Sequence, residues 1–154
     1  MDLPLSGKTA IVTGSSRGIG ASIAQKLAAD GANVVINYHG NDAPACVVTN
    51  TINSREGGKA VMVKADMSTI AGGRLLLEKT IAKFGVPDIL VLNAGVLGHK
   101  TVANMDEPYY DQHFNTNVKG PLFLVQAASA VMKEGEVSLF RFQKRMRYST
   151  GLRW

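Results

Sequence analysis

The chain of 154 residues is 45% apolar and carries a formal net charge of +5, as is typical of one globular domain. A single cysteine, Cys46, excludes an internal disulfide. No run approaches the roughly 18 apolar residues that a membrane-spanning helix needs, and no basic N-terminal stretch precedes a sustained apolar run, so we expect a cytoplasmic protein that does not bind a membrane.

Four short apolar runs along the chain predict buried strands. In each run the apolar residues stand together without alternation, as they do in strands that are covered on both faces. The runs are KTAIVTG at 8–14, NVVIN at 33–37, AVMVKAD at 60–66 and DILVLN at 88–93.

Helical patterns separate these runs. They extend from Ile19 to Gly31, more weakly over 42–56, and over a segment that ends near Gly85. Strands that alternate with such helices predict a doubly wound α/β fold of Rossmann type, with a parallel sheet covered on both faces. After Glu107, a long helix is predicted to bury one face, formed by Phe114, Val118, Leu122, Val125 and Met132.

The segment TGSSRGIG lies between the first predicted strand and its helix, with glycines at 14, 18 and 20. A glycine-rich turn that opens a helix brings backbone N–H groups and the positive end of the helix dipole to one point, where a pyrophosphate can bind. A tight turn without a ligand is the alternative. A phosphate-binding P-loop is excluded because no Gly-Lys-Ser/Thr follows.

Four motifs, in this order, resemble those of the short-chain dehydrogenase/reductase family. They are the three residues between Gly14 and Gly18 with Thr13 ahead of them, Asp66 after the third strand, NAG at 93–95, and Asn117 on the long helix. The resemblance covers about residues 5–135 and points to the ketoacyl- or polyketide-reductase kind.

The resemblance implies a bound dinucleotide, with Asp66 meeting the adenine and Asn117 acting as the catalytic asparagine that anchors a water in a proton relay. Each of these residues, considered alone, also has a purely structural interpretation. Asp66 could cap a helix, Asn93 could be a turn residue, and Asn117 could be a solvated position on a helix. The expected cofactor site consists of Gly14, Ser15, Ser16, Arg17, Gly18, Ile19, Gly20, Asn37, Tyr38, Asp66, Met67, Asn93, Ala94 and Gly95.

Pro121 supports the role of Asn117 independently of the resemblance. Proline has no N–H, so it cannot donate the helical hydrogen bond that the carbonyl of Asn117, four residues earlier, would accept. A free carbonyl in a kinked helix can hold a water. The alternative is that Gly120 and Pro121 only bend the helix around the sheet.

The end of the second strand predicts NADP(H) rather than NAD(H) as the cofactor. An acid at this place would bind the adenine ribose and repel a 2′-phosphate, but the chain has Asn37, Tyr38 and His39 here, with no acid before Asp42. Arg17 in the glycine turn is available for the phosphate. The alternative for Arg17 is a solvated loop charge.

No metal site is expected. The three histidines, His39, His99 and His113, are scattered along the chain, and Cys46 stands alone. No pair among them has the spacing of metal ligands.

The residues that carry the family's proton transfer are not found in the chain. The resemblance implies a Tyr-x-x-x-Lys pair, in which the lysine lowers the pKa of the tyrosine, and a serine that steadies the substrate oxygen. By family spacing this tyrosine falls beyond Trp154, so the predicted fold is incomplete at its C-terminal side. Four residues after the tyrosines at 38, 109, 110 and 148 stand Asp42, His113, Phe114 and Leu152.

Residues 136–154 differ in charge from the rest of the chain. Five Lys or Arg stand against one acid there, whereas residues 1–135 are nearly neutral. The stretch EVSLFRFQKR is also too polar for a central parallel strand. We therefore divide the chain into a dinucleotide-binding Rossmann-type portion, 1–135, and a basic tail, 136–154, that is not native family sequence. A basic arm for nucleic acid and a divergent fifth strand are the alternatives for the tail.

The sequence thus predicts an NADP(H)-dependent short-chain oxidoreductase that transfers a hydride between the cofactor and a ketone or alcohol, in a chain that lacks the catalytic pair. The expected partner is a small-molecule carbonyl or alcohol substrate, and full-length relatives are expected to be homo-oligomeric. Nucleic acid and membranes are not expected partners. A non-catalytic nucleotide-binding or partner-binding fragment is the alternative, and a nucleic-acid binder with a basic tail is the third hypothesis.

We predict that the tail arises from a frameshift, a retained intron or a misassigned exon. The charge balance changes where the family pattern ends, and the expected serine and tyrosine positions fall within or just beyond the tail. Translation of the genomic DNA after codon 135 in the other two frames should restore an apolar strand, a serine and a Tyr-x-x-x-Lys. If neither frame does so, with or without an intron removed, the tail is native sequence.

Overall fold

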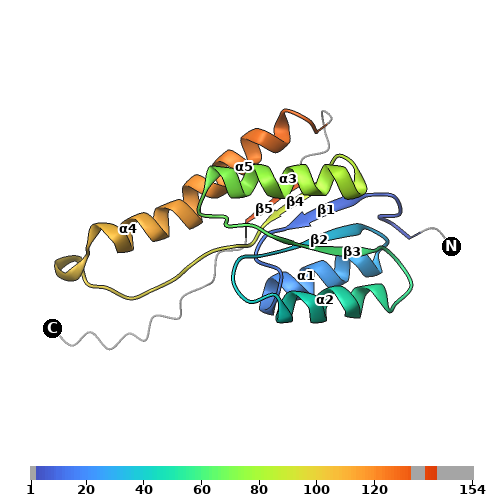
Figure 1. Ribbon diagram of the computed structural model, residues 1–154, viewed down its shortest axis with the longest axis horizontal. Coiled ribbons are helices and arrows are strands. Elements are labelled where there is room, and N and C mark those ends of the chain that lie inside the picture. The colour runs from blue at the N-terminus through green and yellow to red at the C-terminus, as the bar shows by residue number, and fades with distance from the viewer. Residues whose placement is uncertain (1–2, 133–137, 142–154) are drawn as a thin grey trace.

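The computed structural model describes residues 3–132 and 138–141, and a parallel sheet forms its centre (Figure 1). Its strands are β1 (Thr9–Val12), β2 (Asn33–Tyr38), β3 (Ala60–Lys64), β4 (Ile89–Leu92) and β5 (Ser138–Arg141). They lie in the order β3-β2-β1-β4-β5, and each adjacent pair is parallel. β1 is therefore central, and the chain crosses the sheet between β3 and β4.

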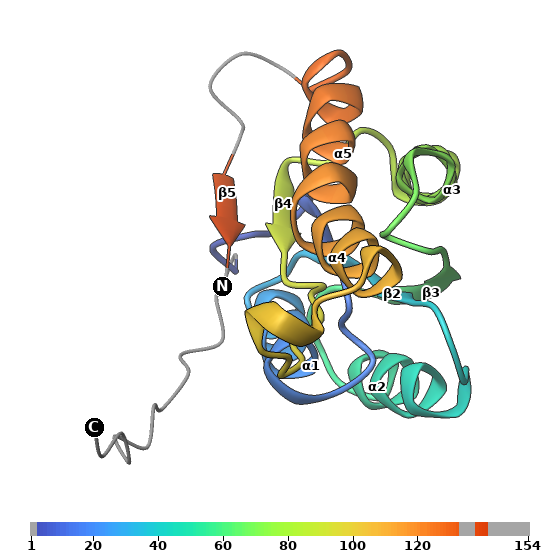
Figure 2. The same cartoon turned by 90° about the vertical axis from the view of Figure 1, so that its left-hand side faces the viewer.

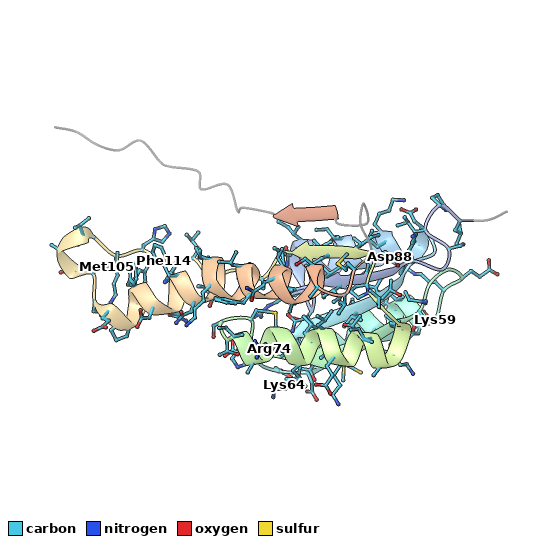
Figure 3. All side chains as sticks on the ribbon, turned by 90° about the horizontal axis from the view of Figure 1, so that it is seen from above. Lys59, Lys64, Arg74, Asp88, Met105 and Phe114 are labelled. Carbon is cyan, nitrogen blue, oxygen red and sulfur yellow. The ribbon has the colours of Figure 1, made fainter. Side chains whose placement is uncertain are left out.

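Helices cover both faces of this sheet. They are α1 (Gly18–Ala29), α2 (Ala43–Asn53), α3 (Ile70–Phe84), η1 (Val102–Asn104), α4 (Glu107–Phe114), η2 (Asn115–Lys119) and α5 (Gly120–Ser129). The α1 and α2 helices lie on one face, and α3 and α5 lie on the other (Figures 1 and 2). α4 and the loop before it extend past the end of the sheet, and Figure 3 shows Met105 and Phe114 on this projecting segment.

The sheet packs against the helices through two apolar layers. Along β1, Ala10 and Val12 belong to the layer shared with α1 and α2, whereas Ile11 belongs to the layer shared with α3 and α5. All three side chains are fully buried. Burial of one such Val or Ile side chain contributes roughly 1.5–3 kcal/mol. Because both faces are covered at β1, β2 and β4, these strands are nearly continuous apolar runs, as the sequence predicted. In β3, buried and more exposed positions alternate.

A glycine allows α5 to approach the turn after β3. A Cβ at Gly120 would lie 1.7 Å from the carbonyl oxygen of Met67, which is far inside van der Waals contact. From this point α5 continues along the sheet, with Leu124 and Ala128 buried in the core. The start of α5 is therefore fixed directly against the turn that carries Asp66 and Met67.

The predicted α/β fold with a doubly wound parallel sheet is confirmed. The four predicted strands occur as β1 to β4, and Pro44 lies in the first turn of α2. Gly31 and Gly85, the predicted stops, follow α1 and α3 with φ of +103° and +89°. Within the described ranges, no helix has the length and apolar character that crossing a membrane requires.

The predicted long helix is interrupted, which changes its buried face. Asn115–Lys119 forms a π-helical segment, in which the carbonyl of Asn115 accepts the N–H of Gly120 five residues later. Pro121 has no N–H, so the regular pattern of bonds four residues apart cannot continue through this point. The resulting change of phase leaves Leu122 61% exposed and buries Leu124 instead.

The predicted apolar face of this helix is thus correct only in its second half. Val125 and Met132 pack against the core, as expected. Phe114 and Val118 are 48% and 45% exposed, because α4 and η2 extend past the sheet and have no strand beneath them (Figure 1).

Ser138–Arg141 forms β5, which pairs in parallel with β4. The expectation that this stretch is not a strand is therefore wrong for these residues. β5 lies at the edge of the described sheet, so the requirement for an unbroken apolar run, which holds for central strands, does not apply to it. Residues 136–137 and 142–154 lie outside the described residues, and the origin of the tail stays a prediction.

Candidate functional site

A cavity of about 630 Å³ opens at the carboxyl ends of the central strands. The chain leaves β1 toward β2 on one side and returns to β4 on the other, and ligands of parallel sheets bind at such a point of reversal. Asn115 and Thr116 of η2 line one side of the cavity. Among the predicted site residues, the cavity is lined by Gly14, Ser16, Arg17, Asn37, Tyr38, Asp66, Met67, Asn93, Ala94 and Gly95.

The remaining predicted residues are not among those that line the cavity: Ser15, Gly18, Ile19, Gly20 and Asn117. Several of them shape the turn behind it. A Cβ at Gly20 would lie 2.5 Å from Nδ2 of Asn93, and a Cβ at Gly14 would lie 2.9 Å from Cα of Ala94. Gly14 also has a φ of +61°, which disfavours other residues. Glycine at these two positions therefore lets the turn after β1 touch the turn after β4.

The backbone N–H groups at the start of α1 have no side-chain cap, and the two residues before this helix line the cavity. Its N-cap residue is Arg17, which has extended backbone and makes no side-chain capping hydrogen bond. Gly18 has a φ of +58°, and a Cβ there would meet nothing within 4 Å. Open space beside a bare helix N-terminus fits a pyrophosphate, because the N–H groups and the helix dipole both favour an anion.

Thr13 and Asn93 tie the ends of β1 and β4 together. Oγ1 of Thr13 accepts the backbone N–H groups of Asn93 and Ala94, both at 2.9 Å. In return, Nδ2 of Asn93 donates to the carbonyls of Thr13 at 2.9 Å and Gly14 at 3.0 Å. Asn93 is thus more than a turn residue, because its side chain fixes the glycine turn from the neighbouring strand.

Asn37 ties the glycine turn to β3. Its side chain is 1% exposed; Oδ1 accepts the N–H of Gly14 at 3.0 Å, and Nδ2 donates to the carbonyls of Ala65 at 3.1 Å and Val63 at 3.4 Å. Ser15 is also buried, and its hydroxyl donates to the carbonyl of Val12 at 2.6 Å. These side chains hold the wall of the cavity in place.

Asp66 and His39 lie close together at the ends of β3 and β2. Oδ1 of Asp66 accepts the N–H and the hydroxyl of Ser68, at 2.9 and 2.8 Å, and lies 3.5 Å from Nδ1 of His39. Desolvation tends to raise the pKa of the Asp66 carboxyl, but the two hydrogen bonds from Ser68 and the charge of His39 together lower it. Asp66 is therefore a carboxylate at neutral pH. It shapes a turn, whereas the cap of α3 is Thr69, which accepts the N–H of Gly72.

Asn117 holds the turn after β4 against η2. Its Oδ1 accepts the N–H of Val96 and its Nδ2 donates to the carbonyl of Val96, both at 2.9 Å. The side chain is thus occupied by protein groups. Pro121 has no N–H, so it cannot donate to the main-chain carbonyl of Asn117.

Several residues of the site were not predicted. His39, Ser68, Gln112, Asn115 and Thr116 also line the cavity. His39 could have been found, since it directly follows Tyr38 at the end of a strand. Gln112, Asn115 and Thr116 carry no such signal, because only the return of the chain through the projecting loop brings them to the cavity.

Metal ligands do not gather in the part of the chain that the structure describes. There, no three side chains of His, Cys, Asp or Glu lie close enough together to hold an ion.

The sequence model of the short chain dehydrogenase family matches residues 8–138. An uncharacterized oxidoreductase of Methylorubrum extorquens is 45% identical to the chain over 131 residues, which are 85% of this chain and 52% of that protein. The chain spans about half the length of the curated relatives it matches.

Solved structures of similar fold contain nicotinamide dinucleotides. A short chain dehydrogenase from Burkholderia cenocepacia in complex with NADP is 37% identical, with a TM-score of 0.83 over 88% of this chain and 55% of that one. An NADH-dependent reductase complexed with NAD is 30% identical, with a TM-score of 0.78 over 85% of this chain and 54% of that one.

We predict that Asn37→Asp lowers the free energy of unfolding by about 3 kcal/mol. The change removes the two hydrogen bonds that Nδ2 donates and places a buried carboxylate against the carbonyls of Val63 and Ala65. Urea denaturation measures this loss.

Asn41→Asp is the matched control for this change. Asn41 is exposed, and its Oδ1 accepts the N–H of Ala43, a bond that a carboxylate keeps. Its stability should therefore be unchanged or slightly raised. Equal stability of the two variants would show that the buried bonds of Asn37 contribute little.

Proposed function

The chain belongs to the short chain dehydrogenase family, and we propose that it is the NADP(H)-binding portion of a cytoplasmic reductase that transfers a hydride between the nicotinamide and a ketone or alcohol. The observation that carries this proposal is the cavity at the point of chain reversal, with an uncapped helix N-terminus beside it. Similar structures contain NADP or NAD at 30–37% identity. A nicotinamide dinucleotide is therefore the ligand class that these comparisons support.

The preference for NADP(H) over NAD(H) rests on this chain's own residues. β2 ends with Asn37 and Tyr38, followed by His39, and none of these carries a carboxylate that would repel a 2′-phosphate. Arg17 lines the same cavity and brings a permanent positive charge. A guanidinium matches the geometry of a phosphate, so it favours the 2′-phosphorylated cofactor.

The residues of the site would act by binding and orienting the dinucleotide. The N–H groups at the start of α1 would hold the pyrophosphate, and Asp66 would accept hydrogen bonds from the adenine. The bound nicotinamide supplies the hydride. Asn117 would present its main-chain carbonyl to a water that relays a proton, while its side chain keeps η2 in register with Val96.

A second function, that of a nucleotide-binding fragment without catalysis, is favoured by one observation. No tyrosine of the sequence is followed four residues later by a lysine, so the group that would exchange a proton with the substrate is not supplied by this chain. In either case, we propose that residues 1–135 bind the dinucleotide, while Ser138–Arg141 of the basic tail adds a strand to the same sheet. Full-length relatives are proposed to be homo-oligomers, and nucleic acid is not a proposed partner.

The chain should bind NADPH about tenfold more tightly than NADH at pH 7, because a charge-assisted hydrogen bond from Arg17 to the 2′-phosphate contributes roughly 1.5–3 kcal/mol. Arg17→Ala should remove most of this difference and leave NADH binding nearly unchanged. Fluorescence titration with each cofactor measures both affinities.

Lys26→Ala is the control for this titration. Lys26 lies at the other end of α1, where it pairs with Asp30, and it is not among the residues that line the cavity. Its removal should leave both affinities as they are. Equal affinities in the unchanged chain, or a preference for NADH that survives Arg17→Ala, would contradict the cofactor assignment.

The purified 154-residue chain should show little or no reductase turnover with NADPH and a panel of ketones. A positioned proton donor typically contributes about 10²–10⁴-fold to the rate, and Asn117 cannot take its place because its side chain is bound to Val96. Consumption of NADPH measured with and without ketone tests this. Turnover that Asn117→Ala abolishes would show that the chain is catalytically sufficient.

A further inference from the structure

The side chain of Asn37, near the end of β2, links the turn after β1 to the turn after β3. Its Oδ1 accepts the N–H of Gly14 at 3.0 Å, and its Nδ2 donates to the carbonyl of Ala65 at 3.1 Å. Both of these partners line the cavity: Gly14 belongs to the glycine turn, and Ala65 directly precedes Asp66. One amide therefore connects the two parts of the site that would hold the pyrophosphate and the adenine.

Asn37 has little left to offer a ligand directly. Only 1% of its surface is exposed, and Nδ2 also donates to the carbonyl of Val63 at 3.4 Å. Both N–H bonds of the amide are thus used within the protein. A contribution of this side chain to ligand binding must therefore act through the positions of Gly14 and Ala65.

Main-chain hydrogen bonds hold the ends of β1, β2 and β3 together without this amide. The N–H of Ser15 donates to the carbonyl of Asn37, and the N–H of Ala65 donates to the carbonyl of Tyr38, both at 2.9 Å. These bonds remain when the side chain of Asn37 is replaced, so the end of β2 stays between its neighbours. Loss of the amide is therefore expected to change the spacing of the two turns but not the topology of the sheet.

Resting on the proposed function, we propose that Asn37 is a positioning residue for the dinucleotide, and that its amide sets the spacing between the glycine turn and the turn that carries Asp66. A dinucleotide joins its pyrophosphate to its adenosine by covalent bonds. The two groups therefore reinforce each other's binding only where the two subsites stand at the matching distance. Without the amide, each group still binds its own subsite, but the gain from joining the two groups decreases.

The test uses three probes on the 154-residue chain in isothermal titration calorimetry. They are adenosine 2′-phosphate, inorganic pyrophosphate, and 2′-phospho-ADP-ribose, which contains both groups. The product of the first two dissociation constants, divided by the third, measures the gain from joining the groups. In Asn37→Leu, which has a similar volume but forms none of the amide's hydrogen bonds, this gain should decrease about tenfold. The dissociation constants of the two separate groups should change less than about twofold.

Thr80→Val is the matched control. Thr80 is fully buried in α3, its hydroxyl donates to the carbonyl of Leu76 at 2.7 Å, and it is not among the residues that line the cavity. This variant also loses a buried hydrogen bond, so its stability should decrease while the gain from joining the groups stays constant. Asn37→Ala is the second test variant. It introduces no bulk, so it should show the decreased gain even if the chain does not accommodate leucine.

The outcomes separate this inference from the proposed function. An unchanged gain in the Asn37 variants, or an equal decrease in Thr80→Val, would overturn the positioning role while leaving dinucleotide binding in place. Equal weakening of pyrophosphate and 2′-phospho-ADP-ribose leaves the gain unchanged, so it would show damage to one subsite only. Binding of neither 2′-phospho-ADP-ribose nor NADPH by an unchanged chain that circular dichroism shows to be folded would overturn the proposed function, and this inference with it.

Discussion

The turns after β1 and β4 lie so close together that no Cβ fits between them. Gly14 touches Ala94, and Gly20 lies against the side chain of Asn93, at separations that alanine could not adopt. This contact places the start of α1 directly beside the end of β4. Residues of both turns line the cavity, which opens at the point of chain reversal.

Neutral polar side chains hold these two turns in place, whereas the charged side chains of the site lie at the edge of the cavity. Thr13, Ser15 and Asn37 are all buried, and each is hydrogen-bonded to backbone groups at the end of a neighbouring strand. A buried amide or hydroxyl that lost its partner would cost roughly 1–3 kcal/mol, so these bonds strongly favour one geometry. Arg17 and Asp66 stand at the surface of this neutral wall, where they can meet a ligand without a large desolvation cost.

The sequence predicted what depends on local pattern. The continuous apolar runs identified β1 to β4, and the glycine turn was recognisable because it joins a strand to a helix. The roles of side chains that act across the fold were not predictable: Asn37 bonds to Gly14, 23 positions earlier, and to Ala65, 28 positions later. The π-helical segment was not predicted. Pro121 indicates that the regular helical hydrogen bonds are interrupted, but it does not indicate which residues form the hydrogen bonds on either side of the interruption. β5 was not predicted because we expected an unbroken apolar run, which is typical of central strands, whereas β5 lies at the edge of the described sheet.

Three asparagines fix the loops of the site, and their chemistry explains why this residue recurs. Loops after strands present both N–H and C=O groups, and an amide side chain is the group that can donate and accept at once. Asn37 and Asn117 each use both ends of the amide, whereas Asn93 uses its two N–H bonds on two successive carbonyls.

Aspartate has nearly the same shape as asparagine, but it would turn a carboxylate toward those carbonyls and lose every bond that Nδ2 donates. The amides therefore allow the wall of the cavity to be rigid and neutral at the same time. That neutrality matters for a site that receives a phosphate-bearing ligand, because the net charge that the ligand meets is then set by the few ionisable side chains at the rim, Arg17, His39 and Asp66.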